Sequence, residues 1–212
     1  MVAGFDFPNP AIQQNHRPGG GTPEPREATE GEPAKPVTVS QSLNPNRSGL
    51  MAARPLMIEL LRTDSWLADP FAEAVEKSYR QYLLHCDPLQ RFSLVSFAWG
   101  PGQQTPIHDH TVWGVLGVLR DEESSQRYVQ GDGEMHPSGA IEMMGAGGID
   151  MVSPTIGDIH KVWNASKTKA VSIHLYGGNI GAINRHTFSN DGTIKTFCSG
   201  YSSEVIPNAW ES

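Results

Sequence analysis

From Phe92 onward, apolar and polar residues alternate in short runs, and this pattern restricts the fold more than any other feature of the chain. The runs cover residues 92–99, 111–119, 126–130, 140–144, 149–152 and 170–176. Clusters of glycine and proline separate them, at residues 100–102, 131–133, 137–139 and 145–148. A period of two with regular turn residues indicates β-strands. Many short strands favour a mainly β fold, either an antiparallel sandwich or a small barrel.

The segment before these strands has a helical pattern. An apolar stripe at spacings of three and four predicts a helix from Arg54. Its residues are Leu56, Met57, Leu60 and Leu61. Asp69 and Pro70 suit the start of a second helix, because the carboxylate caps it and proline fits the first turn. The buried face of this helix should hold Phe71, Val75, Tyr79 and Tyr82, before an end at residues 86–88.

Residues 1–50 differ in composition from the rest of the chain. Eight of the 16 prolines lie between Pro8 and Pro45, and large apolar residues are scarce there. Such a segment buries too little apolar surface to offset the entropy lost on ordering. We expect a disordered Pro/Gly-rich tail over residues 1–50 and one folded domain over residues 51–212, in which two helices lead into a β-barrel.

Charge and hydropathy exclude several classes of protein. The formal net charge is −7 and Lys and Arg do not cluster, so neither nucleic acid nor a membrane surface is expected as a partner. The sequence has no apolar run of about 18 residues and no secretory signal pattern at its start. Cys86 and Cys198 are too few for a disulfide scaffold. These features predict a cytoplasmic protein and leave its oligomeric state open.

Three histidines have the spacing of a metal site. His108 and His110 are two residues apart on an expected strand, so their imidazoles point to the same face. His160, from another strand, would complete a facial set that leaves coordination positions open. Three neutral imidazoles leave the full charge on a divalent metal, which favours anionic ligands such as a thiolate. Spacing alone does not separate iron from zinc, which would activate water instead.

The expected strand at residues 170–176 carries a second set of polar residues. Ser172, His174 and Tyr176 alternate with aliphatic residues and therefore share one face. This face either lies in solvent or lines a pocket. In a pocket the three side chains would form a hydrogen-bond chain that ends in a phenol, a group able to donate to an anion.

Two segments resemble the paired motifs of the cupins. In the first, Gly102 is followed after five residues by His108-x-His110. The residues similar to the second motif are Gly148, Pro154, Gly157, His160 and Asn164. Cupins place a glutamate four or five residues after the first pair, where this sequence has Val115 and Leu116. The resemblance implies a small jelly-roll barrel whose metal site lacks a carboxylate.

The whole combination resembles the thiol dioxygenases, the cysteine dioxygenase family of cupins, from about Arg54 to Trp210. The segments that carry this resemblance are residues 106–114 and the polar residues of the strand 170–176. Gly-Tyr-Ser and Pro-Asn-x-Trp, near residues 200–210, resemble the bacterial branch that oxidises 3-mercaptopropionate.

This resemblance implies a mononuclear non-haem Fe(II) held by three histidines. The implied ligands are His108, His110 and His160. It also implies an outer-sphere relay made of Ser172, His174 and Tyr176. The implied reaction adds both atoms of O₂ to the sulfur of a small thiol carboxylate, which gives a sulfinic acid. In animal members a cysteine bonds to the tyrosine that Tyr176 resembles, and its position here is Gly114.

The resemblance also bears on the substrate. Cysteine-specific members have an arginine two residues after a tyrosine on a helix before the barrel, and the similar pair here is Tyr79 and Gln81. The bacterial 3-mercaptopropionate enzymes have glutamine there and an arginine beyond the tyrosine strand, similar to Arg185. This implies a carboxylate anchor at Arg185 and a neutral hydrogen bond from Gln81. A cysteine dioxygenase, a zinc or manganese cupin hydrolase or isomerase, and a non-catalytic metal-binding cupin remain alternatives.

Overall fold

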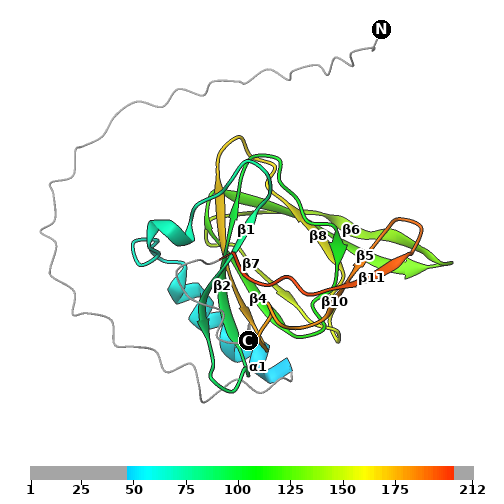
Figure 1. The fold of residues 1–212 in the computed structure, drawn as a ribbon, viewed down its shortest axis with the longest axis horizontal. Helices are drawn as coiled ribbons and strands as arrows, with labels where there is room; N and C mark the ends of the chain where they lie inside the picture. Colours follow the sequence, from blue (N-terminus) through cyan, green and yellow to red (C-terminus); the bar gives the residue numbers. More distant parts are fainter. Residues whose placement is uncertain (1–46, 203–212) are drawn as a thin grey trace, which may run out of the picture. The chain divides into compact units, whose positions relative to one another are not determined.

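A computed structural model of the chain describes residues 47–202 (Figure 1). The helices in this part are α1 (Arg47–Leu60) and the short 3-10 helix η2 (Asp69–Phe71). The strands are β1 (Arg80–Cys86), β2 (Ser93–Trp99), β3 (Ile107–His108), β4 (Gly114–Arg120), β5 (Glu122–Gly131), β6 (Glu134–Gly145), β7 (Ile149–Val152), β8 (His160–Trp163), β9 (Ala170–Tyr176), β10 (Arg185–Phe188) and β11 (Ile194–Phe197). Neither described helix combines the length and apolarity that a membrane span requires.

The strands form two antiparallel sheets. One has the order β1-β2-β9-β4-β7 and the other the order β11-β10-β3-β8-β5-β6. Most neighbours are distant in sequence, as where β9 pairs with β2 on one side and β4 on the other. The two sheets face each other in Figure 1, and Val162 of β8 packs with Val95 and Phe97 of β2 between them. This arrangement confirms the predicted mainly β fold, with two antiparallel sheets that face each other.

Helix α1 covers the outer face of the five-stranded sheet. Its Leu50, Ala53 and Met57 are buried against β4 and β9, where they meet Val115 and Ile173. These helical residues recur at intervals of three and four, which places them on one face. The helix begins at Arg47, earlier than the predicted start at Arg54, so the last residues of the predicted tail belong to it. The rest of that tail, residues 1–46, lies outside the described residues.

The predicted second helix is wrong. Asp69 and Pro70 do begin a helical turn, but no side chain caps it, η2 ends at Phe71, and β1 occupies the last part of the expected helix. The spacing of the aromatic residues suggested a helix, but residues 79–83 also fit the two-residue alternation of a strand. Pairing of β1 with β2 along nearly its whole length satisfies the backbone and overrides the helical pattern.

The other strand predictions are largely confirmed. Residues 149–152 and 170–176 form β7 and β9 with the predicted bounds, and the remaining runs lie wholly or mostly within longer or shifted strands. Strands were expected at His108 and His160, and β3 and β8 are found there, but β3 ends at His108, so His110 lies beyond the strand that was expected to carry it. The strands β10 and β11 were not predicted. The expected turn at 137–139 lies inside β6, where Gly139 has a φ of 76° and the pairing with β5 shifts register.

Asn164, from the second cupin-like motif, fastens loops at one end of the barrel. Its Nδ2 donates to the carbonyl oxygens of Trp99, Gly100 and Thr168 at 3.4, 3.3 and 2.8 Å. Its Oδ1 accepts from the backbone N–H of Ser166 at 2.9 Å. The side chain is fully buried, so these hydrogen bonds have no replacement in water.

Replacing Asn164 with Ala should lower the free energy of unfolding by about 2–4 kcal/mol, because each buried group left unsatisfied costs about 1–3 kcal/mol. Urea unfolding of the full chain measures the change. Asn190→Ala, at an exposed position, is the control and should shift stability by less than about 0.5 kcal/mol. Equal stability of the two variants would contradict this role.

Candidate metal centre

The structure brings the three predicted ligand histidines together. His108 ends β3 and His160 begins β8, and the two residues are direct partners across the antiparallel pair. His110 follows two residues after His108. One nitrogen from each ring lies within 4.8 Å of the others, and all three side chains are buried. Among residues 47–202, this is the group of histidines, cysteines and acids that can hold a metal ion.

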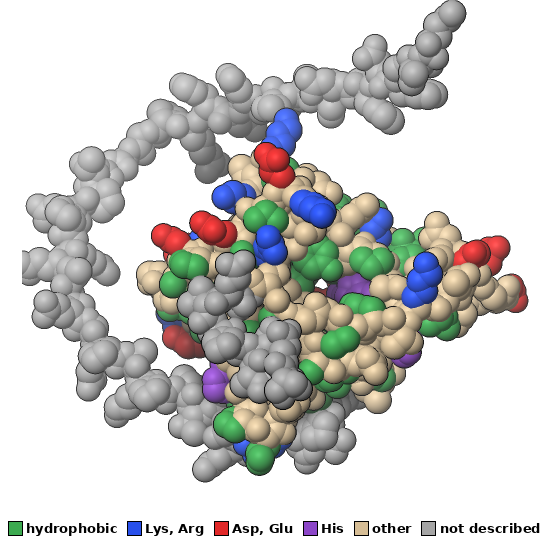
Figure 2. Space-filling model, viewed as in Figure 1, with side chains coloured by type: hydrophobic (Ala, Val, Ile, Leu, Met, Phe, Trp, Pro, Cys, Tyr) green, Lys and Arg blue, Asp and Glu red, His purple; other side chains and the backbone are tan. Residues whose placement is uncertain are grey.

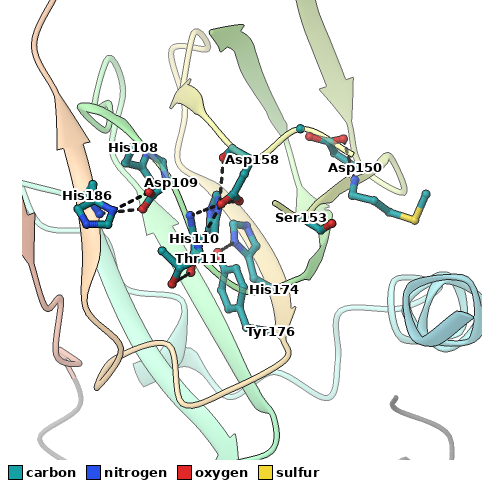
Figure 3. Close-up of polar contacts among 12 residues, drawn as sticks. His108, Asp109, His110, Thr111, Asp150, Ser153, Asp158, His174, Tyr176 and His186 are labelled. Atoms are coloured by element: carbon teal, nitrogen blue, oxygen red, sulfur yellow. Dashed lines mark hydrogen bonds and ion pairs between the residues drawn. The ribbon is translucent and has the colours of Figure 1, made fainter. Parts of the chain in front are cut away.

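Hydrogen bonds fix two of the three rings. His108 Nδ1 lies 3.1 Å from the carbonyl oxygen of Pro106. His110 Nδ1 lies 3.1 Å from Oδ1 of Asp158, and the other carboxylate oxygen accepts from the backbone N–H groups of His110 and Thr111 (Figure 3). Both rings are then protonated at Nδ1, which leaves Nε2 as an electron-pair donor. Asp158 thus both orients one ligand and holds the turn that carries it.

The electrostatics of the cluster suit a metal ion. Burial lowers the pKa of His108 to about 4, and burial also holds the pKa of His110 and His160 well below the usual value. The imidazoles are therefore neutral at neutral pH and can donate electron pairs. The Nδ1 atom of His160 is buried and has no hydrogen-bond partner in the described part of the chain. Three neutral nitrogen donors without a carboxylate fit a divalent first-row metal such as Fe(II) or Zn(II).

The polar residues of β9 form the expected chain. His174 Nδ1 lies 2.8 Å from the hydroxyl of Tyr176, and His174 Nε2 lies 2.9 Å from Ser172 Oγ. The Tyr176 ring stacks on His110, with 5.5 Å between ring centroids. Burial lowers the pKa of His174 to about 3 and raises the pKa of Tyr176. At neutral pH, the chain therefore links a neutral imidazole to a protonated phenol beside the metal site.

A cavity of about 270 Å³ opens beside the three histidines. Histidine atoms are visible in a hollow in Figure 2. Tyr79, Tyr176 and Arg185 line the cavity together with the aliphatic side chain of Leu116. None of the described lining residues is acidic.

Arg185 and Gln81 both reach this cavity. Arg185 begins β10 and is 4% exposed; its Nη2 donates to Ser199 Oγ at 2.7 Å and its guanidinium lies 4.7 Å from the Phe197 ring centre. Gln81 lies on β1, and not on a helix as expected, and its Nε2 donates to Ser199 Oγ at 3.3 Å and to the Gly200 carbonyl at 3.2 Å. Tyr79, which directly precedes β1, lines the same cavity as Gln81.

Asp158 and Ser199 were not predicted as residues of the site. Both lie in loops and act on the site through hydrogen bonds from segments distant in the chain. His186 is half-buried, and its Nδ1 lies 2.7 Å from Asp109, whose side chain faces away from the three clustered histidines. The Pro-Asn-x-Trp motif at residues 207–210 lies outside the described residues.

Removing one ligand should abolish stoichiometric metal binding. His108→Ala, His110→Ala and His160→Ala should each lose most bound Fe(II) or Zn(II). Asp158→Ala keeps three ligands but frees one ring, so its metal affinity should fall by about 10–100-fold. Metal content per chain and competition with a chelator measure both effects. His136→Ala, at an exposed histidine, is the control, and a His160 variant that retains one metal per chain would contradict the assignment.

Comparisons with known proteins give one family match and several distant structural similarities. The family model for cysteine dioxygenase type I matches residues 69–189. An uncharacterised protein of Klebsiella pneumoniae with a double-stranded β-helix domain has 16% identity, with 60% of this chain and 91% of that chain covered and a TM-score of 0.40. A cupin superfamily protein of Desulfitobacterium hafniense has 14% identity, coverage of 50% and 84%, and a TM-score of 0.39. Since the family match spans more than half of its residues, the chain belongs to the cysteine dioxygenase type I family.

Proposed function

We propose that this protein is a non-haem Fe(II) thiol dioxygenase that converts 3-mercaptopropionate and O₂ to the corresponding sulfinic acid. The observation that carries the proposal is one cavity lined by three buried, neutral histidines and by the buried cation of Arg185. A ferrous ion held by His108, His110 and His160 would supply adjacent positions for the thiolate and O₂ and the redox chemistry of the oxygen transfer. The protein's own groups bind and orient the substrate.

An anionic partner would stabilise the buried guanidinium of Arg185. Among the described residues it has no carboxylate partner, and its Nε is buried without a hydrogen bond. Its Nη2 bonds to Ser199, a neutral group. A buried guanidinium is stabilised when a carboxylate pairs with its planar fork. A substrate carboxylate in the cavity supplies that partner and so fixes the distance at which the thiol is presented.

The charge of the lining favours a substrate without an amino group. Cysteine would bring an α-ammonium into a cavity whose described lining contains no acidic residue. Gln81 is neutral, and its amide already donates to Ser199 Oγ and the Gly200 carbonyl. The ammonium of cysteine would lose water without gaining a counter-charge. This difference supports 3-mercaptopropionate over cysteine.

Metal analysis combined with oxygen uptake tests the proposal. The full chain should contain iron and consume one O₂ per sulfinic acid formed from 3-mercaptopropionate. Zinc or manganese with no thiol-dependent uptake would overturn the proposal in favour of a hydrolase or isomerase. Tight metal binding with no turnover of any kind would indicate a non-catalytic cupin, and a higher kcat/KM for cysteine would indicate a cysteine dioxygenase.

Arg185→Ala should lower kcat/KM for 3-mercaptopropionate by about 10–100-fold, since a hydrogen bond to a charged group is worth about 1.5–3 kcal/mol. Cysteamine carries no carboxylate, so its kcat/KM should change little in the same variant. Arg62→Ala, at an exposed arginine, is the matched control. Unchanged kcat/KM for 3-mercaptopropionate in Arg185→Ala would remove Arg185 from the substrate site.

Tyr176 should carry no covalent link to cysteine. A Cβ atom at Gly114 would lie 2.8 and 2.9 Å from Cδ1 and Cε1 of the Tyr176 ring, so this is the position from which a cysteine would reach the phenol. The chain has glycine there, and Cys86 and Cys198 are free. Peptide mass spectrometry of the active protein should find Tyr176 unmodified, and a peptide joining Tyr176 to a cysteine would contradict this expectation.

A further inference from the structure

Glu123 of β5 is a buried acid that the proposed reaction does not yet use. Its side chain is 3% exposed and forms hydrogen bonds with Ser172 and Trp99. Trp99 Nε1 also donates to Ser172 Oγ at 3.3 Å. The Oε1 atom of Glu123 is buried with no hydrogen-bond partner in the described part of the chain. Glu123 therefore extends the chain Tyr176–His174–Ser172 at the end away from the phenol.

The surroundings of Glu123 leave its charge unfixed. Burial raises the pKa of Glu123 to about 7, against the opposing effect of the hydrogen bonds from Ser172 and Trp99. A small cavity beside it is lined by three further ionisable groups, which are Asp150 of β7, His160 of β8 and His174 of β9. Asp150 is paired with Arg127, and burial keeps both histidines neutral. Among the described residues no charged group holds Glu123 in one protonation state.

An ionised Glu123 orders the chain in one direction. A carboxylate only accepts hydrogen bonds, so the Ser172 hydroxyl donates to it. The lone pairs of Ser172 then accept from Trp99 Nε1–H and from His174 Nε2–H. Because a neutral imidazole has a single N–H, His174 Nδ1 is bare and accepts from the Tyr176 hydroxyl. In this state the phenol proton points away from the cavity.

A protonated Glu123 orders the same atoms in the opposite direction. Its O–H donates to Ser172 Oγ, and the Ser172 hydroxyl donates to His174 Nε2. The single N–H of His174 is then on Nδ1 and donates to the Tyr176 oxygen. The Tyr176 O–H is free to donate into the cavity. In both arrangements each link between Glu123 and Tyr176 joins one donor to one acceptor, and the two arrangements differ by one proton.

We propose that Glu123 is the proton acceptor at the inner end of this chain and that its protonation sets the direction of the Tyr176 hydroxyl. The proposal rests on the proposed function for the source of the proton, which is the substrate thiol. Glu123 touches no substrate, so it is a positioning residue that acts through Ser172, His174 and Tyr176.

The proton balance of the step is complete. The S–H bond of the thiol breaks and its proton binds the Tyr176 oxygen, while the former phenol proton passes to His174 Nδ1. The Nε2 proton passes to Ser172 Oγ, and the former Ser172 proton passes to Glu123. The net change converts thiol and carboxylate into thiolate and carboxylic acid. The Tyr176 hydroxyl then points at the anion that has formed in the cavity.

The His174 tautomer tests this proposal without turnover. Nitrogen NMR of the full-length protein, metal-free and with Zn(II) bound, reports which ring nitrogen carries the proton. In the wild type the proton should lie on Nε2 above a midpoint near pH 7 and on Nδ1 below it. Glu123→Gln should show one tautomer throughout the pH range, and Glu122→Gln, at the neighbouring residue, should behave as the wild type. A single tautomer in the wild type at all pH values would overturn the proposal, even if Glu123→Gln fails to fold.

Kinetics give the second test. Wild-type kcat/KM for 3-mercaptopropionate should rise as pH increases through the titration of Glu123 in the free enzyme. In Glu123→Gln this transition should disappear, leaving only the ionisation of the thiol in solution, above about pH 8. At neutral pH the variant should lose about a hundred-fold in kcat/KM, a typical contribution of a positioned acid–base group.

Glu123→Asp separates the role of the carboxylate from packing. It retains the acid and should recover part of kcat/KM together with a pH transition, whereas Glu122→Gln should keep the wild-type profile. A transition near pH 7 that persists in Glu123→Gln would overturn the proposal. If no thiol is oxidised but the His174 tautomer still changes with the protonation of Glu123, the proposed function is wrong. The proposed role of Glu123 in orienting the hydrogen-bond chain is then still supported.

Discussion

Strand β9 lies between two neighbours in its sheet and has no face in solvent, and the site depends on this burial. Its aliphatic residues pack under α1, so its alternating polar residues must point into the barrel. A buried polar group without a partner costs about 1–3 kcal/mol, and Ser172, His174 and Tyr176 avoid that cost by bonding to one another. The same packing that stabilises the barrel therefore sets a rigid phenol beside His110.

The charges around the cavity determine which ligands it can bind. The three clustered histidines are neutral because burial lowers their pKa values, and Leu116 adds an aliphatic side chain to the same cavity. A divalent metal and the guanidinium of Arg185 would add positive charge to a cavity with no acidic residue among those described. A ligand with a thiolate and a carboxylate matches this charge, because the thiolate would bind the metal and the carboxylate would pair with the guanidinium.

The sequence predicted the groups that have a regular spacing. His108 and His110 are two residues apart, and the polar residues of β9 alternate with apolar residues. Such spacings can be recognised in the sequence without knowing the conformation of the loops. The second helix failed because aromatic residues spaced three and four apart also fit a strand, and only pairing with β2 decides between them. The position of Gln81 in the cavity was predicted through resemblance, while the element that carries it was wrong.

The supporting groups could not be predicted because their partners come from remote segments. Gln81 and Arg185 meet at Ser199, which follows β11, and only the completed fold brings the three together. The next residues fasten this segment: Ser202 N–H donates to the Gln81 carbonyl at 2.7 Å, and the Tyr201 hydroxyl donates to Asn179 at 2.6 Å. The Gly-Tyr-Ser motif at residues 200–202 thus has a physical role. It closes the C-terminal segment against β1, and that closure places one hydroxyl where it accepts from both the amide and the guanidinium.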